Sequence, residues 1–291
     1  MKIKATRAEK TFDFFNVLIV SLLAVICLYP MYYVFINSFS SASAVARGEV
    51  TILPRGFSLA SYRSIFENVS FLQSMGNTVI YTVLGTAISL VLCVLCAYPL
   101  SVPSFSGRKV FTILITFTMF FNGGMIPTYL VVKSMNMLDS IWAMVIPAAI
   151  STYNVIIIRT FFQGISPEMR ESAYMDGAND FVILCRIMIP LSLPVLATIT
   201  LFCAVGLWNG FMPALLYLND KTKYPMQMIL RNMLIAEQMS EQYANIAGEM
   251  EILPETLKYA SIIISTGPIL VVYPFLQRYF VKGVMIGSVK G

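Results

Sequence analysis

The chain has 291 residues, of which 57% are hydrophobic and 12% are charged. Soluble domains carry roughly 25% charged residues, so this composition excludes an ordinary soluble protein and indicates an integral membrane protein. The net charge of +5 comes from Lys and Arg residues that are scattered along the sequence. A clustered basic patch for nucleic acid is therefore absent from the sequence.

Six apolar segments are each close to or longer than the roughly 20 residues that a helix needs to cross a bilayer. Lipid offers the backbone no hydrogen bonds, so segments of this length are predicted to be helices. They cover about residues 14–36, 76–100, 110–132, 141–162, 187–218 and 259–281. Prolines in the third, fifth and sixth segments predict kinks. The expected fold class is an all-α integral membrane protein with six transmembrane helices.

The first apolar segment has two interpretations. Its basic start and the small residues at 41–46 resemble a secretory signal peptide with a cleavage site. Its apolar run is longer than the roughly 7–15 residues of a signal-peptide core, which favours an uncleaved helix. Residues 1–13 are then a cytoplasmic N-terminal segment, and residues 14–291 form the transmembrane domain.

The distribution of Lys and Arg predicts the orientation, because short cytoplasmic loops are enriched in these residues. If the N-terminus is cytoplasmic, basic residues lie in both chain ends and in the short inner loops. These are Lys2, Lys4, Arg7, Lys10, Arg108, Lys109, Arg159, Arg170, Arg186, Arg278, Lys282 and Lys290. We therefore expect a multi-pass membrane protein with both termini in the cytoplasm.

Two long outer segments, residues 37–74 and 219–258, connect the predicted helices. The second is patterned as a short helix over about 225–240 and is rich in Glu. It is either a solvated acidic cap or a docking surface for an external partner, since loops of this length are often functional.

The cytoplasmic segment 163–186 carries the signals of a short helix. Ser166 is a good N-cap residue, and Pro167 suits the first helical position. Glu168 and Glu171 lie near the positive end of the helix dipole. Gly177 suits the turn at the other end, because glycine adopts left-handed backbone angles freely. A helix of about ten residues is too short and too charged to cross the bilayer, so it should lie along the cytoplasmic face.

The same segment contains a longer pattern with fixed spacing. It reads Glu171-Ser172-Ala173, then Gly177, then Ile187, then Ile189-Pro190. This resembles the EAA loop of ABC importer permeases: Glu-Ala-Ala, three residues, Gly, nine residues, Ile, one residue, Leu-Pro. The spacing matches throughout, and only Ser172 and Ile189 depart from the pattern, both conservatively. Residues 122–130, 208–211, 277–283 and 287–291 are also similar to carbohydrate permeases of the MalG-like class, in particular its LplC/YtcP-like subgroup.

The resemblance implies an ABC type I importer permease-like fold in which the short helix couples the permease domain to an ATPase. The implied coupling residues are Glu168, Glu171, Ser172, Ala173, Asp176, Gly177 and Ala178. Ala173 and Gly177 are expected to leave a low surface that a groove of the ATPase can approach. The implied partners are a second homologous permease subunit, two ATPase subunits and an extracytoplasmic solute-binding protein, in a bacterial cell membrane.

The motor of such an importer must be a separate polypeptide. A phosphate-binding loop requires a Gly-Lys pair, and no such pair occurs in the sequence. ATP and Mg²⁺ are therefore expected on the partner ATPase, with no cofactor in this chain. The sequence also contains no histidine, and its five cysteines lie in or beside apolar stretches, where we interpret them as buried small hydrophobes. We expect no catalytic residue and no metal site.

Neutral polar and aromatic residues, rather than charges, lie in the middle of the apolar segments. Such side chains suit an oligosaccharide, which needs hydrogen bonds to its hydroxyls and a ring to stack on. The candidates for the substrate pathway are Asn122, Tyr153, Trp208 and Asn209. Each also has a purely structural interpretation, because Asn often joins membrane helices and Tyr or Trp often marks the interface.

Two other classes of function compete with an importer permease. An ion-coupled secondary sugar transporter would need intramembrane ionisable residues or broken-helix ion sites, and an internal repeat; neither is clear, and it would leave the pattern of residues 171–190 unexplained. The other is a non-transporting scaffold or a membrane enzyme, and an enzyme lacks candidate residues, since there is no histidine, no activated Ser or Cys and no pair of intramembrane carboxylates.

Overall fold

The computed structural model describes residues 7–244 and 255–288, and it describes the side chains of residues 9–236 and 256–274. Every regular element in this part of the chain is a helix. The three longest helices are α1 (Arg7–Ser38), α4 (Val69–Ser101) and α15 (Glu255–Ser288). The others are α2 (Ala42–Ala46), α3 (Ala60–Glu67), α5 (Arg108–Phe120), α6 (Met125–Ser134), α7 (Ile141–Val145), α8 (Thr152–Gln163), α9 (Pro167–Met175), α10 (Asp180–Ile183), α11 (Ile189–Leu191), α12 (Leu193–Asn209), α13 (Met212–Tyr217) and α14 (Met226–Ala244). A π-helical turn η1 (Leu184–Met188) and a 3₁₀ turn η2 (Lys221–Lys223) complete the order.

Three helices of the described residues are long and apolar enough to cross a bilayer: Glu9–Ser38, Val69–Ser101 and Thr256–Pro274. Two bent pairs raise the number to five if each pair is one span. The all-helical fold class is thus confirmed, and the first, second and sixth predicted segments each fall on one continuous helix. The count of six spans is not established and stays a prediction.

The first bent pair coincides with the third predicted segment. The second overlaps the fifth, 187–218, but begins earlier at Asp180 and ends at Asn209, because the extended backbone of Gly210 separates α12 from α13. The chain bends by 115° between α5 and α6, next to Gly124. The φ of Gly124 is +87°, a conformation that only glycine adopts readily. The chain bends by 83° between the stretch Asp180–Leu191 and α12. Pro190 lies just before this bend and has no N–H to continue the helical hydrogen bonds. The π-helical turn η1 lies just before this bend, where the hydrogen-bond pattern must adjust.

The fourth predicted segment, 141–162, differs from a single continuous helix. Helix α7 ends at Val145, α8 begins at Thr152, and residues 146–151 between them are not helical. Pro147 lies in this gap and cannot donate a backbone hydrogen bond. The side chain of Ser151 then caps α8 by accepting from the N–H of Asn154, so the second helix has its own start signal.

The chain divides into two compact units, and the first comprises residues 1–68 and 232–266. Its core joins the end of α1 to the segment after it through Ile36, Ala44, Val45 and Val50, with Tyr259 of α15 packed against them. Ser61 donates to Thr256 at 2.7 Å, which ties α3 to the start of α15. The apolar body of α1 is exposed on all sides, as expected for a helix that faces lipid or another subunit.

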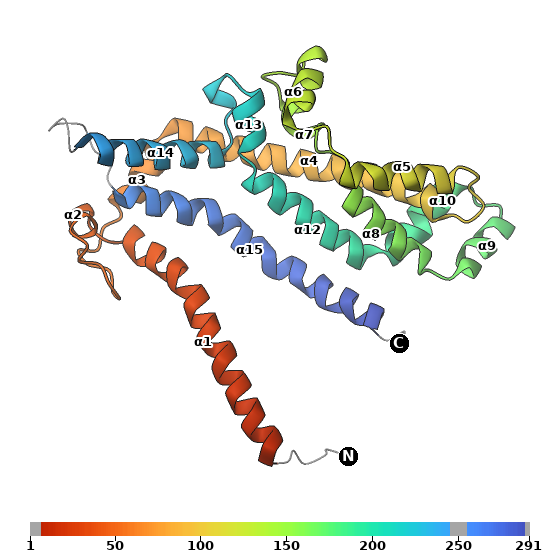
Figure 1. The fold of residues 1–291 in the computed structure, drawn as a ribbon, viewed down its shortest axis with the longest axis horizontal. Helices are drawn as coiled ribbons and strands as arrows, with labels where there is room; N and C mark the ends of the chain where they lie inside the picture. The colour runs from red at the N-terminus through yellow and green to blue at the C-terminus, as the bar shows by residue number, and fades with distance from the viewer. Residues whose placement is uncertain (1–6, 245–254, 289–291) are drawn as a thin grey trace. The chain divides into compact units, whose positions relative to one another are not determined.

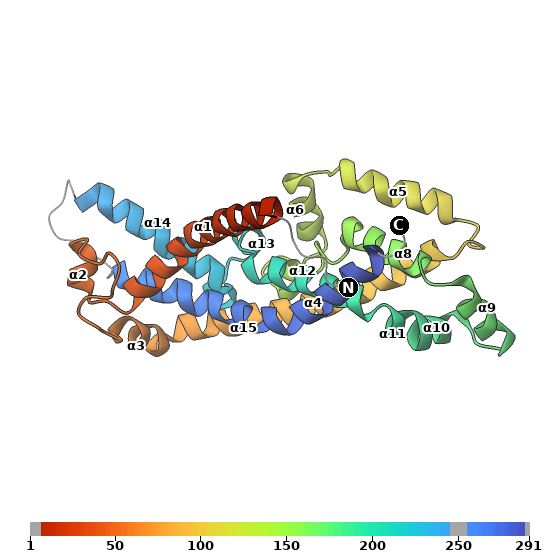
Figure 2. The same cartoon turned by 90° about the horizontal axis from the view of Figure 1, so that it is seen from below.

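The second unit comprises residues 69–231 and 267–291 and is built around α4. Helices α8 and α12 pack along α4, and both views of the ribbon show the three side by side (Figures 1 and 2). Cys93, Ala97, Ile158, Ile183 and Ile199 lie at the centre of this core and are fully buried. The prediction that the cysteines are buried is right for Cys93 but wrong for two others, Cys27 and Cys185, which are exposed.

The predicted helix of the second long outer segment is present as α14, which begins at Met226. The tail pattern at 277–283 lies on α15, but its side chains fall outside the described part of the structure, as does the pattern at 287–291. The basic residues Lys2 and Lys4 also lie outside the described residues.

Candidate functional site

The predicted cytoplasmic helix is present as α9, with Pro167 at its first turn and Gly177 at its end. Gly177 has a φ of +80° and donates to the carbonyl of Tyr174 at 3.0 Å. The N–H of Ala178 donates to the carbonyl of Ala173, also at 3.0 Å. This pair of bonds is a Schellman motif, which satisfies carbonyls that the end of a helix leaves without partners. Ser166 occupies the N-cap position as predicted, but its side chain makes no capping bond.

The two faces of α9 differ in burial. Glu168, Glu171, Ser172 and Met175 follow a spacing of three and four residues, so they share one face, and all four are exposed. Met175 is 87% exposed, and sequence reasoning did not single it out. The expectation that Ala173 leaves a low surface for a partner is wrong. Ala173 is only 9% exposed, because its face of the helix packs on the core of α4 and α8.

The remaining coupling candidates lie at the turn after α9. Asp176 and Gly177 are exposed, and Ala178 is partly buried against the same core as Ala173. The acidic residues of this segment and Ser172 are thus exposed, whereas Ala173 and Ala178 pack against the core and hold α9 in position. Whether these residues bind an ATPase stays a prediction.

A carboxylate that sequence reasoning missed ties α9 to the long helix α4. Asp180 accepts hydrogen bonds on one oxygen from Tyr174 of α9 at 2.7 Å and from Tyr98 of α4 at 3.0 Å. The bond to Asp180 raises the pKa of the Tyr174 hydroxyl, because it stabilises the protonated phenol. These two bonds connect the exposed helix α9 to the membrane-length helix α4 through one carboxylate. No sequence signal distinguishes Asp180 from the neighbouring Asp176.

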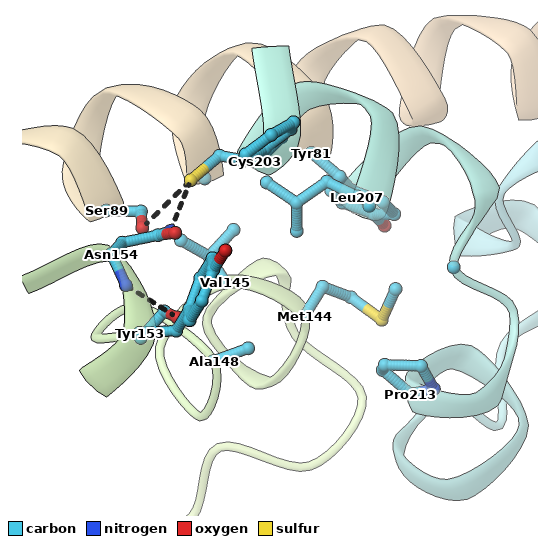
Figure 3. A pocket seen from close by; sticks show the side chains of 15 residues that line it. Tyr81, Ser89, Met144, Val145, Ala148, Tyr153, Asn154, Cys203, Leu207 and Pro213 are labelled. Atoms are coloured by element: carbon cyan, nitrogen blue, oxygen red, sulfur yellow. Dashed lines mark hydrogen bonds between the residues drawn. The ribbon is translucent and has the colours of Figure 1, made fainter. Parts of the chain in front are cut away.

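A cavity of about 480 Å³ lies in the second unit, between α4, the α7–α8 segment and α12 (Figure 3). Its polar lining residues include Ser89, Ser151, Asn154 and Cys203, which come from three different helices and a loop. The volume falls within the roughly 300–1,000 Å³ of small-molecule sites. The sequence could not predict this grouping, because the residues are far apart in the chain and follow no motif.

The four predicted substrate-pathway residues do not meet in this cavity. Tyr153 lines it, and the residue is 54% exposed. Trp208 is buried in a separate apolar cavity of about 250 Å³ with Pro268. Asn122 accepts the N–H of Gly124 at the bend between α5 and α6. The remaining candidate, Asn209, donates to a carbonyl of its own helix, so both asparagines have a structural explanation.

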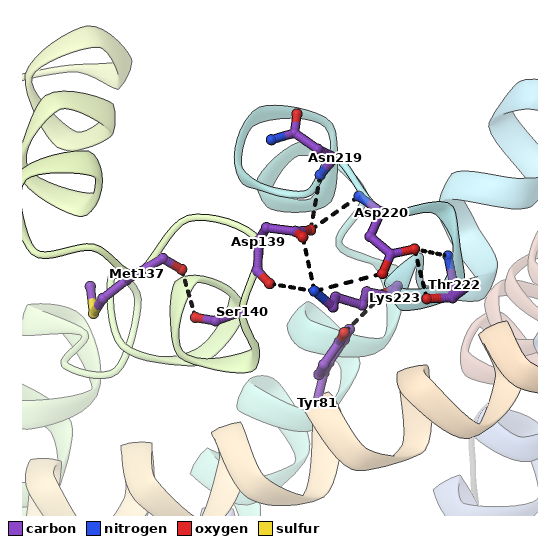
Figure 4. Close-up of polar contacts among 8 residues, drawn as sticks. All are labelled: Tyr81, Met137, Asp139, Ser140, Asn219, Asp220, Thr222 and Lys223. Atoms are coloured by element: carbon purple, nitrogen blue, oxygen red, sulfur yellow. Dashed lines mark hydrogen bonds and ion pairs between the residues drawn. The ribbon is translucent and has the colours of Figure 1, made fainter.

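A cluster of ion pairs and hydrogen bonds lies on the predicted outer side (Figure 4). One carboxylate oxygen of Asp139 accepts the N–H groups of Asn219 and Asp220, and the other forms an ion pair with Lys223 at 2.8 Å. The hydroxyl of Tyr81 donates to the carbonyl of Lys223. The cluster therefore holds the turn before α7 and the segment after α13 to each other and to α4.

The charges in this cluster stabilise one another. The hydrogen bond from Lys223, followed by that from the N–H of Asp220, lowers the pKa of Asp139. The bond to Asp139 raises the pKa of Lys223. A lowered folded-state pKa means that the ionised carboxylate contributes stability above its ordinary pKa, and that this contribution is lost as the pH falls through the lowered value.

We expect Asp139→Asn to lower the melting temperature at pH 7, because the ion pair is lost. Asparagine tolerates the φ of +55° at this position, so backbone strain does not complicate the comparison. The difference in melting temperature between wild type and variant should be largest at neutral pH and should vanish once the pH lies below the lowered pKa of Asp139. Thermal unfolding in detergent across this pH range measures it. Equal melting temperatures at pH 7 would show that the cluster does not hold these segments.

Comparison with known proteins places these features in a family. Residues 78–286 match the family described as "Binding-protein-dependent transport system inner membrane component". The chain is 43% identical over 286 residues to the protein LplC of Bacillus subtilis (strain 168), with 98% of this chain and 97% of that protein covered. It is 45% identical over 269 residues to the polygalacturonan/rhamnogalacturonan transport system permease protein YtcP of the same organism, with 92% and 94% covered.

Solved structures agree with the sequence relatives. A chain of a bacterial ABC transporter involved in the import of the acidic polysaccharide alginate matches with a TM-score of 0.87 and 38% identity, over 96% of this chain and 100% of that chain. A chain of the alginate transporter in complex with an alginate pentasaccharide-bound periplasmic protein matches with a TM-score of 0.60 and 16% identity, covering 92% and 93%, which supports the fold alone. The chain belongs to the family of binding-protein-dependent transport system inner membrane components, as a permease of the sugar-importing ABC type.

Proposed function

We propose that the chain is one of two permease subunits that carry oligosaccharides across a bacterial cell membrane, powered by two separate ATPase subunits that bind ATP and Mg²⁺. A second, homologous permease completes the pore, and an extracytoplasmic binding protein delivers the sugar. Six membrane spans with both termini in the cytoplasm fit this arrangement and agree with the distribution of Lys and Arg.

The observation that carries the coupling part of the proposal is the structure of α9. The helix is fixed by a Schellman motif and by the Asp180 bonds, while one face presents Glu168, Glu171, Ser172 and Met175 to solvent. A short helix that is rigidly attached on one side and exposed on the other can transmit a rigid-body movement of a bound ATPase. Through Tyr98, that movement would reach α4.

The substrates that we propose are oligosaccharides derived from polysaccharides that contain uronic acids. The support comes from relatives, since YtcP is described for polygalacturonan and rhamnogalacturonan and the matched transporter for alginate. The four tentative pathway residues, Asn122, Tyr153, Trp208 and Asn209, stay candidates for contact with the sugar. Tyr153 is the strongest of them, because its exposed ring lines the 480 Å³ cavity.

Purification of the tagged protein in a mild detergent, followed by mass spectrometry of the proteins that accompany it, tests the proposed assembly. We expect a second permease of this family and an ATPase with a phosphate-binding loop. Recovery of the chain alone, folded and stable, would contradict the subunit assignment and would favour the ion-coupled transporter.

A further inference from the structure

Asn154 is the feature of the cavity that most needs an explanation. It is 6% exposed and lines the cavity from α8 (Figure 3). Its Nδ2 donates to Sγ of Cys203 at 3.3 Å, and Oγ of Ser89 lies 3.5 Å from the same sulfur. A thiol is a weak hydrogen-bond acceptor, so the buried amide is poorly satisfied by this partner.

The other end of the same amide has no partner at all. No group in the described part of the chain donates to Oδ1 of Asn154, and this oxygen is not among the fully buried atoms that lack a partner, so it keeps surface that a ligand can reach. The hydroxyl of Tyr153, which lines the same cavity, likewise makes no hydrogen bond within the described residues. The cavity therefore offers a free carbonyl oxygen, a weakly bound amide N–H and a free phenol to a ligand that can both donate and accept.

The lining residues contain no charged side chain. Aromatic and aliphatic groups, among them Phe202, Leu207 and Met144, form most of the wall. A carboxylate in such a setting would lose its hydration without gaining a cation, which is strongly unfavourable. Sugar hydroxyls and the apolar C–H face of a pyranose ring fit the same wall well, with the exposed ring of Tyr153 available for stacking.

Gly206 keeps the cavity open. A Cβ added to Gly206 would meet no atom within 4 Å, so neither helix packing nor backbone conformation requires a glycine here. Glycine is a weaker helix former than alanine, and Gly206 nevertheless lies in the last turn of α12. The missing side chain leaves room in the cavity that any other residue would fill.

We propose that this cavity is a sugar subsite within this single permease subunit, which binds an uncharged face of one residue of the transported oligosaccharide through Asn154, Tyr153 and Ser89. The inference rests on the proposed function, since it takes the transported oligosaccharide as the ligand. It adds that any carboxylate of the cargo is held outside this cavity. Recognition here then depends on hydroxyl geometry and not on charge.

The test uses the complete transporter in proteoliposomes, with its ATPase and binding protein, and radiolabelled galacturonate and mannuronate trisaccharides as probes. We expect Gly206→Val to fill the cavity and to reduce the uptake rate at low substrate concentration by roughly tenfold, mainly through a higher KM. Gly206→Ala should give a smaller loss. Gly76→Val is the matched control, because Gly76 also lies in a helix and a Cβ built on it meets no atom within 4 Å, but it lies outside the cavity. It should transport within about twofold of wild type.

A second measurement does not depend on whether the valine variant assembles. N-ethylmaleimide should alkylate Cys203 of the wild-type transporter more slowly when the transported trisaccharide is present, while the exposed Cys185 outside the cavity reacts at an unchanged rate. Equal uptake by Gly206→Val and wild type, or equal alkylation of Cys203 with and without sugar, would overturn the subsite. A wild-type transporter that takes up neither trisaccharide would instead contradict the proposed substrate class, and the subsite with it.

Discussion

Gly177→Pro should reduce oligosaccharide uptake to less than about a tenth of the wild-type rate while the protein remains in the membrane. Proline cannot adopt the φ of +80° that Gly177 has, and it lacks the N–H that reaches the carbonyl of Tyr174. The Schellman motif would open, and the bond from Ala178 to Ala173 would be lost with it. Helix α9 would then no longer be held in a fixed position for the ATPase.

Gly177→Asn is the matched control for this variant. No atom lies within 4 Å of a Cβ built on Gly177, so either side chain fits and only the backbone requirement differs. Asparagine is the residue other than glycine that most readily ends a helix in the left-handed conformation. Uptake by the asparagine variant should stay near wild type. If the proline variant transports normally with the ATPase bound, the coupling role of this turn is wrong.

Glu171→Lys should remove the ATPase from the purified complex and should lower uptake by roughly tenfold or more. Glu171 is exposed and forms no ion pair or hydrogen bond within the described residues, so its reversal leaves the fold intact. At a docked interface the same reversal places like charges together or removes a buried partner, which costs several kcal/mol. A cost of only about 1.4 kcal/mol already corresponds to tenfold in affinity.

Two variants control for charge and for assembly. Glu171→Gln keeps the shape of the side chain and should give an intermediate loss. Glu67→Lys reverses an exposed charge on α3, where only a surface ion pair with Arg63 is lost, and should retain the ATPase. Co-purified ATPase, measured by quantitative mass spectrometry, separates these outcomes. Retention of the ATPase by Glu171→Lys would remove this residue from the docking surface.

The parts of the fold that could be predicted from the sequence are those that local chemistry determines. Long uninterrupted apolar runs predicted the spans within α1 and α4 because the bilayer leaves the backbone no alternative to a helix. Gly177 predicted the end of α9 because the turn requires a positive φ. The spacing from Glu171 through Gly177 to Pro190 also indicated the permease family to which the chain belongs.

Breaks in the helices were harder to predict. Pro30 and Pro99 lie within the continuous helices α1 and α4, whereas Pro147 falls in the gap between α7 and α8. A proline alone therefore does not decide between a kink and a break, because neighbouring packing determines whether the lost hydrogen bond is compensated. The second start signal at Ser151, which caps α8, distinguishes the break.

Tertiary packing decided the features that sequence reasoning missed. The size of Ala173 is visible in the sequence, but the side of α9 that packs on α4 and α8 is not, so its burial was not foreseen. The meeting of Ser89, Asn154 and Cys203 likewise depends on how three helices pack together. The sequence does not set Asn154 apart from other neutral polar residues of the apolar segments, and only the structure shows that no described group donates to its Oδ1.

The most direct test of the central claim is uptake of a labelled uronate trisaccharide into proteoliposomes that contain both permeases and the ATPase. Uptake should require ATP and Mg²⁺ on the ATPase side and the binding protein on the opposite side, and it should continue after an ionophore collapses every ion gradient. Uptake that persists without ATP and stops when the ionophore is added would contradict ATP-driven import and would identify an ion-coupled transporter.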